Sequence, residues 1–379
     1  MKIIQIKFNL KLCAFLLLAT TFIAGCKKDD VIPIDNVTFA NIQVNSNQEV
    51  PTNTSSATGT SNIIYEKNTN TLTYIINYSG VTPTAMHFHK GAVGVSGAVE
   101  IEVKAPYTSG MTGILKLTDA QETDLLAGLW YLNIHSATFA GGEIRGQVVA
   151  ENFMVISNVA LNGRQEVPQN ASTATGAFNG VFDKTTKKIT YSMAINGFTP
   201  TMLHLHTGEV GISGGVAVGL AASGGITDAL NATQEADLLA GKIYVNVHSA
   251  TFTGGEIRGQ IATLNQIVYA VAASGANEVP ANTSTATGSV YTVYNKTTKS
   301  LAYTINFNGV VPINMHFHKA AIGANGSVES GIAGPYTIGM KGTATLTAAQ
   351  EVDLFAGLWY FNLHSAAFTG GEIRGQLVR

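Results

Sequence analysis

Residues 130–147 read Trp-Tyr-Leu-Asn-Ile-His-Ser-Ala-Thr-Phe-Ala-Gly-Gly-Glu-Ile-Arg-Gly-Gln, and closely similar strings occupy residues 243–260 and 359–376. In each string, apolar residues alternate with a Tyr, an Asn and a His, which is the pattern of a strand with one buried face. The last seven residues, Gly-Gly-Glu-Ile-Arg-Gly-Gln, are identical in the three places. The recurrence predicts three copies of one β domain, each ending in this pair of strands.

A second landmark gives the length of the repeat. The motif Gln/Asn-Glu-Val-Pro occurs at 48–51, 165–168 and 277–280, at offsets of 117 and 112 residues. Such a period is too long for a solenoid repeat and fits whole domains in a row. We therefore predict domains at 37–150, 151–265 and 266–379. Because no linker rich in Pro, Ser or Gly separates them, we expect stiff joints.

Local signals within a copy predict mostly strands. The segments 71–78 and 301–307 alternate and are rich in β-branched and aromatic residues. One short helix is predicted before the last two strands, because each copy has a capping box followed by a Gly suited to the left-handed C′ position. These boxes start at Thr118, Asn231 and Thr347, and the glycines are Gly128, Gly241 and Gly357. The predicted class is all-β, with three tandem Greek-key β-sandwich or barrel domains.

All nine histidines belong to one arrangement that occurs once per copy: a His-x-His pair followed 42 to 46 residues later by a single His. In the first copy, alternation places Met86 and Phe88 on one face of a strand and both histidines on the other. The histidines are His87, His89 and His135; His204, His206 and His248; and His316, His318 and His364. If the two strands of a copy are neighbours, its three imidazoles converge outside the core.

Three imidazoles without a thiolate make a nitrogen site suited to Cu or Zn, with a fourth position open. Other polar residues share the predicted faces and could orient the imidazoles: Asn133, Glu143 and Arg145, with their copies Asn246, Glu256, Arg258, Asn362, Glu372 and Arg374. The alternative is a buried polar network in which these side chains satisfy one another. A proton-sensing or ligand-reading role is a third interpretation.

Catalytic signals are weak. Residues 211–215 fit Gly-x-Ser-x-Gly, but the equivalent stretches 94–98 and 323–327 do not, which indicates a Gly-rich loop. A hydrolase with a His-bound zinc water and Glu143 as base is a further hypothesis. No phosphate loop, EF-hand loop or dinucleotide motif occurs in the sequence. The sequence therefore assigns no catalytic residue, and enzymatic activity is not the favoured prediction.

The N-terminus has the pattern of a targeting signal. Three lysines precede an apolar run at 12–23, and Ile-Ala-Gly-Cys at 23–26 resembles the lipobox of a bacterial lipoprotein. That resemblance implies removal of residues 1–25, lipidation of Cys26 and a tether at 26–36. Lys27 after the cysteine then favours the outer membrane or cell surface of the bacterial envelope. The mature chain would keep no thiol, because Cys13 lies in the removed segment.

Charge excludes one class of partner. Loss of three N-terminal lysines leaves 19 basic and 24 acidic residues, a net charge of −5. A mildly acidic chain with scattered Lys and Arg lacks the basic surface that nucleic acid requires, so no nucleic-acid partner is expected.

The order of motifs resembles a known family. Glu-Val-Pro, Thr-Gly, His-x-His, Tyr-x-Asn-x-His-Ser and Gly-Gly-Glu-Ile-Arg-Gly-Gln are similar to the CHRD domain, named for chordin and found in many bacterial secreted proteins. The likeness covers residues 37–379 and implies an all-β extracellular module. In chordin-type proteins the module belongs to a scaffold that binds growth factors. For bacterial members the resemblance implies no general activity.

The His-x-His strand and the Gly-Arg-Gly strand also resemble copper, zinc superoxide dismutase, a Greek-key barrel with imidazole ligands on its outer face. Each copy here has only three histidines, which argues against a bridging imidazole, a second metal and dismutation, and leaves mononuclear binding open. The second copy has no counterpart of Lys90 and Lys319 and carries Lys242-Ile243 in place of Leu-Trp. We expect its site to bind more weakly or differently.

Two functions follow as expectations. The first is a surface-anchored, non-catalytic lipoprotein whose three domains present a binding or adhesive array to a protein or glycan, gaining avidity by repetition. The alternative is a metal-binding protein with one Cu or Zn at each three-His site.

Overall fold

The structure is a computed structural model that describes residues 35–378. The predicted signal at 1–25, Cys26 and most of the predicted tether lie outside the described residues. Within them, no helix is both long and apolar enough to cross a membrane.

The described residues form three antiparallel sheets of eight strands, one for each copy. The first contains β1 (Asn36–Asn45), β2 (Thr58–Glu66), β3 (Thr71–Ser79), β4 (Pro83–Lys90), β5 (Val99–Glu102), β6 (Met111–Lys116), β7 (Trp130–Ser136) and β8 (Ile144–Val148). The second contains β9 (Phe153–Asn162), β10 (Thr175–Asp183), β11 (Lys188–Asn196), β12 (Met202–Thr207), β13 (Val216–Gly219), β14 (Gly225–Ile226), β15 (Ile243–His248) and β16 (Ile257–Ile261). The third contains β17 (Gln266–Ser274), β18 (Thr287–Asn295), β19 (Ser300–Asn308), β20 (Pro312–Lys319), β21 (Ser327–Ile332), β22 (Met340–Thr345), β23 (Trp359–Ser365) and β24 (Ile373–Gln376).

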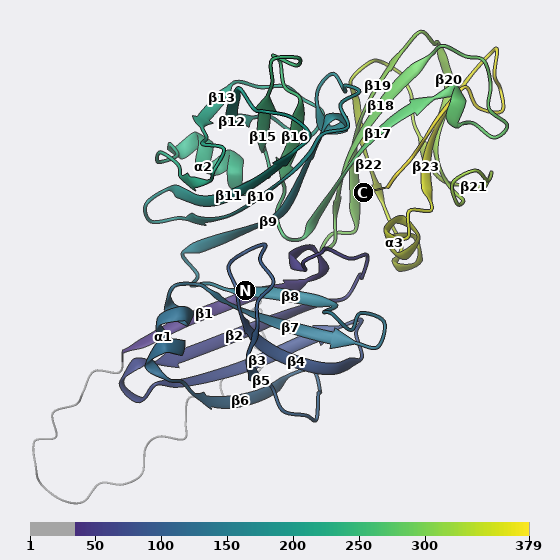
Figure 1. The fold of residues 1–379 in the computed structure, drawn as a ribbon. Helices are drawn as coiled ribbons and strands as arrows, with labels where there is room; N and C mark the ends of the chain where they lie inside the picture. Colours follow the sequence, from purple (N-terminus) through teal and green to yellow (C-terminus); the bar gives the residue numbers. More distant parts are fainter. Residues whose placement is uncertain (1–34, 379) are drawn as a thin grey trace, which may run out of the picture. The chain divides into compact units, whose positions relative to one another are not determined.

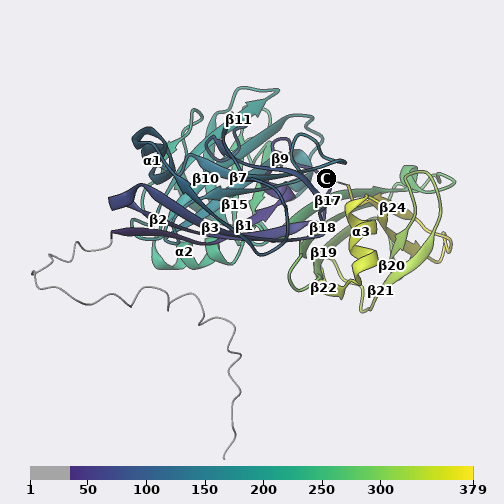
Figure 2. The ribbon, with the colours of Figure 1, turned by 90° about the horizontal axis from the view of Figure 1, so that it is seen from below.

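One short helix follows the sixth strand of each copy: α1 (Asp119–Leu126), α2 (Ala232–Leu239) and α3 (Ala348–Phe355). Each begins with the predicted capping box. The side chain of the N-cap residue accepts a hydrogen bond from the backbone N–H of the Gln three positions later, and that Gln side chain accepts one from the backbone N–H of the N-cap residue. Gly128, Gly241 and Gly357 follow with φ of 71°, 72° and 70°, so the predicted helix ends are confirmed. Figures 1 and 2 both show α3 beside strands of the third sheet. Single 3-10 turns lie at Ser46–Gln48, Lys67–Thr69, Gly163–Gln165 and Gly275–Asn277.

The strand order within a sheet explains where the histidines lie. In the first domain it is β5-β4-β7-β8-β1-β2-β3-β6, and the other two sheets repeat it. The chain therefore leaves β3 near one edge and returns as β4 near the other, next to β7. The all-β prediction is confirmed, and each domain is a single sheet that curls around its own core (Figure 1).

The core of each domain lies on the inner face of its curled sheet. In the first domain Met86, Phe88, Leu132 and Ile134 are fully buried there, as alternation predicts. Trp130 and Trp359 are also fully buried, and Ile243 takes their place in the second domain. Because neighbouring residues on a strand point to opposite faces, His87, His89 and His135 are directed away from this core.

Candidate metal centres

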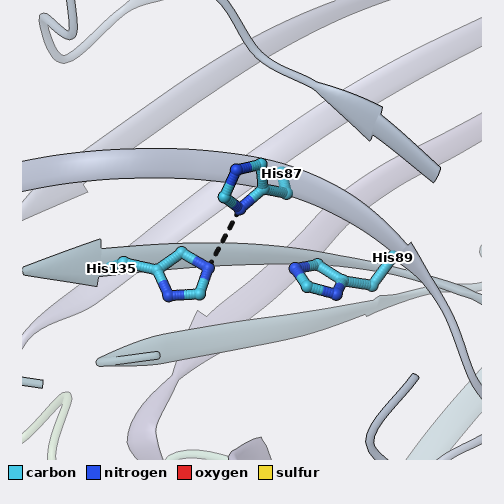
Figure 3. A group of neighbouring side chains, drawn as sticks. All are labelled: His87, His89 and His135. Atoms are coloured by element: carbon cyan, nitrogen blue, oxygen red, sulfur yellow. Dashed lines mark hydrogen bonds between the residues drawn. The ribbon is translucent and has the colours of Figure 1, made fainter. Parts of the chain in front are cut away.

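The three histidines of each domain come together on one face of two paired strands. In the first domain β4 and β7 are antiparallel, with His87 opposite Asn133 and His89 opposite Tyr131. His87 Nδ1 lies 3.1 Å from His135 Nε2, and the ring centroids of His89 and His135 are 5.9 Å apart (Figure 3). The corresponding Nδ1–Nε2 distance is 3.3 Å in both other domains. In each triad, one nitrogen per residue lies within 4.8 Å of the other two.

Backbone carbonyl groups determine which nitrogens face the centre. His89 Nδ1 lies 3.0 Å from the Gly97 carbonyl oxygen, and His135 Nδ1 lies 3.0 Å from that of Ala140. Since a carbonyl oxygen only accepts hydrogen bonds, each Nδ1 carries the proton, and in the neutral ring Nε2 keeps its lone pair. The same bonds hold the other triads through Gly214 and Thr253, and through Gly326 and Thr369. Two lone pairs therefore point inward in every triad.

One inward nitrogen in each triad is unsatisfied. His89 Nε2 is buried and, within the described part of the chain, has no hydrogen-bond partner; the same holds for His206 and His318. A buried polar atom left in this way costs stability, so its recurrence calls for an explanation. Burial lowers the pKa of His89, and burial together with His135 lowers that of His87. Both rings are therefore neutral near pH 7, which is the form that ligates metals.

Tyr131 and Arg145 support the triad from the side. The Tyr131 ring stacks on His89, with centroids 4.9 Å apart, and the Arg145 guanidinium lies 3.5 Å from the centroid of the Tyr131 ring. The Tyr131 hydroxyl accepts from the Gly97 amide. Arg145 itself is only 2% exposed and donates to the carbonyl oxygens of Val95 and Ala92. Arg145 thus holds the loop that positions His89.

The other residues predicted to orient the imidazoles contact different groups. Asn133 pairs with His87 across the strands, but its side chain interacts with Glu49. Glu143 accepts a hydrogen bond of 2.6 Å from Ser55 Oγ. The second and third domains repeat the bond to Glu256 and to Glu372. These side chains stabilise the ends of the strands, whereas the imidazoles are held by backbone carbonyls and by Tyr131.

The role of a buried carboxyl group that interacts with Asn133 was not recognised from sequence. Burial raises the pKa of Glu49 to about 7, although Arg145 acts in the opposite direction. Burial likewise raises the pKa of Glu166 to about 7, and it raises that of Glu278. The Glu-Val-Pro motif served in the sequence only as a landmark of the repeat. Its recurring acid next to two apolar residues was the available signal.

A role for the Gly-rich loop that contains Gly97 and its copies was also not recognised from sequence. A Cβ added to Gly97 would lie 1.5 Å from the Lys90 carbonyl oxygen, and one added to Gly214 would lie 1.5 Å from that of Thr207. At Gly326 the corresponding distance is 1.7 Å. These glycines permit the close approach that brings their own carbonyl groups to the imidazoles. A Gly at the same place in all three copies was the signal in the sequence.

Comparison with known proteins gives one match. A family model described as the CHRD domain matches residues 41–148, 157–261 and 269–377. No curated protein and no solved structure shows a significant match. Each matched range carries one eight-stranded sheet and one histidine triad. The chain therefore belongs to the CHRD domain family and contains three of these domains in tandem.

Proposed function

We propose that each CHRD domain binds one Cu or Zn ion through its histidine triad. The observation that carries the proposal is the buried Nε2 of His89, His206 and His318, which faces two other imidazole nitrogens and has no partner among the described residues. The ligand atoms in the first domain would be His87 Nδ1, His89 Nε2 and His135 Nε2. Three protein ligands leave one position for water or another ligand.

The distances are compatible with that ligand set. Two imidazole nitrogens bound to tetrahedral zinc, each about 2.0–2.1 Å from the ion, lie about 3.3 Å apart. The His87 Nδ1–His135 Nε2 pair and its two copies are separated by 3.1 to 3.3 Å. A purely structural network accounts for this pair as a hydrogen bond, but it leaves the third inward nitrogen unsatisfied.

The proposal includes a location and a second candidate function. The lipobox-like residues 23–26 support anchoring of the three domains in a bacterial envelope through Cys26, at the outer membrane or cell surface. Repetition of one domain three times favours a non-catalytic array that binds a protein or glycan partner with avidity. That candidate requires the full array to bind a repetitive surface more tightly than any single domain does.

The metal proposal is tested by elemental analysis. We expect the full chain, purified without a histidine tag and dialysed against trace Cu and Zn, to hold close to three ions by inductively coupled plasma mass spectrometry. The variant His87→Ala/His89→Ala/His135→Ala should hold two, because one triad is removed. Lys90→Thr, at the end of the same strand, is the matched control and should hold three. A folded wild-type chain without stoichiometric metal would overturn the proposal.

A further inference from the structure

The three triads have different neighbours on the edge strand beside them. In the first domain the residue paired with His87 across β4 and β5 is Glu102. At the same register the second domain pairs His204 with Gly219, and the third pairs His316 with Gly331. Residues directly opposite each other in an antiparallel pair point to the same face, with Cβ atoms about 4.5–5.5 Å apart. The first triad therefore has a carboxylate beside it at a place where the other two have only hydrogen.

The Glu102 carboxylate is free to change partners. Its ion pair is with Lys104, and the two side chains are 52% and 79% exposed. An exposed pair of this kind contributes little stability, so a nearby cation could compete for the carboxylate. The second and third domains have Ala221 and Ala333 where the first has Lys104, so the ion pair is confined to the first domain.

The other two edge positions are open. A Cβ built on Gly219 or Gly331 meets no atom within 4 Å among the described residues. The third domain has a glutamate nearby, Glu329, but its carboxylate accepts from Gln350 of α3, as Glu100 accepts from Gln121 of α1. Both glutamates are bound to a helix, and each lies at the β-bulge of its edge strand, where it is not paired with a histidine.

The carboxylate beside the first triad matters for the charge balance of a bound metal ion. A divalent ion held by three neutral imidazoles keeps both of its charges, and an uncompensated charge in a partly buried site is unfavourable. In the second and third domains the neighbouring Arg258 and Arg374 are cations and cannot balance a metal ion. The buried Glu166 and Glu278 interact with Asn246 and Asn362 and not with the imidazoles. The second and third triads thus have no adjacent carboxylate of their own among these neighbours, and they have free space over the glycines.

We propose that the metal ions of the second and third domains accept a small anion from solution over Gly219 and Gly331, whereas Glu102 balances the charge of the first. The inference rests on the metal binding proposed above. It makes the three sites inequivalent: the first is completed within the chain, and the other two are open to an external ligand.

The test counts anions on the copper(II)-loaded full chain. Azide is the probe, because azide bound to copper(II) gives a charge-transfer absorption band that can be titrated. We expect two azide ions per chain for the wild type and three for Glu102→Gln, which keeps the shape and removes the charge. The double variant Gly219→Glu/Gly331→Glu should bind none with wild-type affinity. Glu100→Gln, which removes a charge from the same strand but faces α1, should still bind two.

The outcomes distinguish the anion-binding inference from the metal-binding proposal on which it rests. Three copper ions that all bind azide alike in the wild type, or a Glu102→Gln variant that behaves as the wild type, would overturn the inequivalence and leave metal binding intact. A folded chain that takes up no copper would overturn both.

Discussion

The first and second domains contain the same histidine triad but surround it with different residues. Trp130 fills the core beneath the first site and Ile243 does so in the second, and both are fully buried. Lys90 forms an ion pair with Asp124 at the end of the first His-x-His strand, where the second domain has Thr207. The distance from Nδ1 of the first histidine to Nε2 of the third is nevertheless 3.1 Å in the first domain and 3.3 Å in the second. The bonds from His89 and His206 to backbone carbonyl groups are both 3.0 Å long.

The triad depends on features that the two domains have in common. Features that the two domains share are the pairing of the two strands, the glycine whose carbonyl bonds the central histidine, and the Tyr–Arg stack. The two domains differ in a core side chain, in a surface ion pair and in the residue opposite the first histidine, and these differences leave the ligand positions unchanged. Weaker or different binding by the second site stays a prediction. If it occurs, its cause lies in the surroundings of the ligands and not in their geometry.

The largest effect should come from a shared feature. In Gly97→Ala the new methyl group would collide with the Lys90 carbonyl oxygen, so the loop must move and its carbonyl must leave His89. We expect a loss of about 3 kcal/mol or more in unfolding free energy, together with the first metal ion. Because Trp130 lies in this domain, its fluorescence in a Trp359→Phe background reports the unfolding. Gly141→Ala, where a Cβ meets nothing within 4 Å, is the control, and equal stability of the two variants would contradict the role of Gly97.

A second shared feature is the buried acid, whose effect depends on pH. The pKa of Glu49 is raised from 4.5 to about 7, so the native state binds a proton more tightly than the unfolded state. The resulting stabilisation is complete below pH 4.5 and is lost as the pH rises through 7, by on the order of 3 kcal/mol. Glu49→Gln should remove this dependence and be the more stable form above pH 7. Denaturant unfolding from pH 4.5 to 8 measures the difference, and Glu166→Gln should behave alike.

An exchanged core residue should affect stability without affecting the site. Trp130→Ile gives the first domain the residue of the second, and we expect it to cost about 2 kcal/mol because the core loses volume. Calorimetry measures the change in stability, and elemental analysis should still find the wild-type number of metal ions. Loss of one ion in the folded variant would show that the core side chain positions the triad after all.

The smallest effect is expected at the surface. Lys90→Thr removes the ion pair with Asp124 and makes the strand end resemble that of the second domain. The Lys90 side chain is 47% exposed, so neither the unfolding free energy nor the metal affinity of the first site should change measurably. A weaker affinity measured by competition with a chelator would mean that the missing lysine does distinguish the second domain.

Local patterns in the sequence were sufficient for much of the fold. The alternation in residues 86–89 places Phe88 in the core because successive side chains of a strand point to opposite faces. The capping box at Thr118 predicts the start of α1 because its bonds join residues three positions apart. The threefold recurrence of whole motifs predicts the number of domains. Each of these signals depends on residues that are close in sequence or on repetition itself.

The sequence by itself determined that each copy carries three histidines on the polar faces of two strands. Only the tertiary structure decided that β4 lies beside β7, so that His87 and His135, which are far apart in sequence, are 3.1 Å apart. It also decided that the carbonyl of Gly97 selects the tautomer of His89 and that Glu49 is buried beside Asn133. Strand order, burial and backbone contacts arise from the packing of distant segments, and no local pattern of residues encodes them.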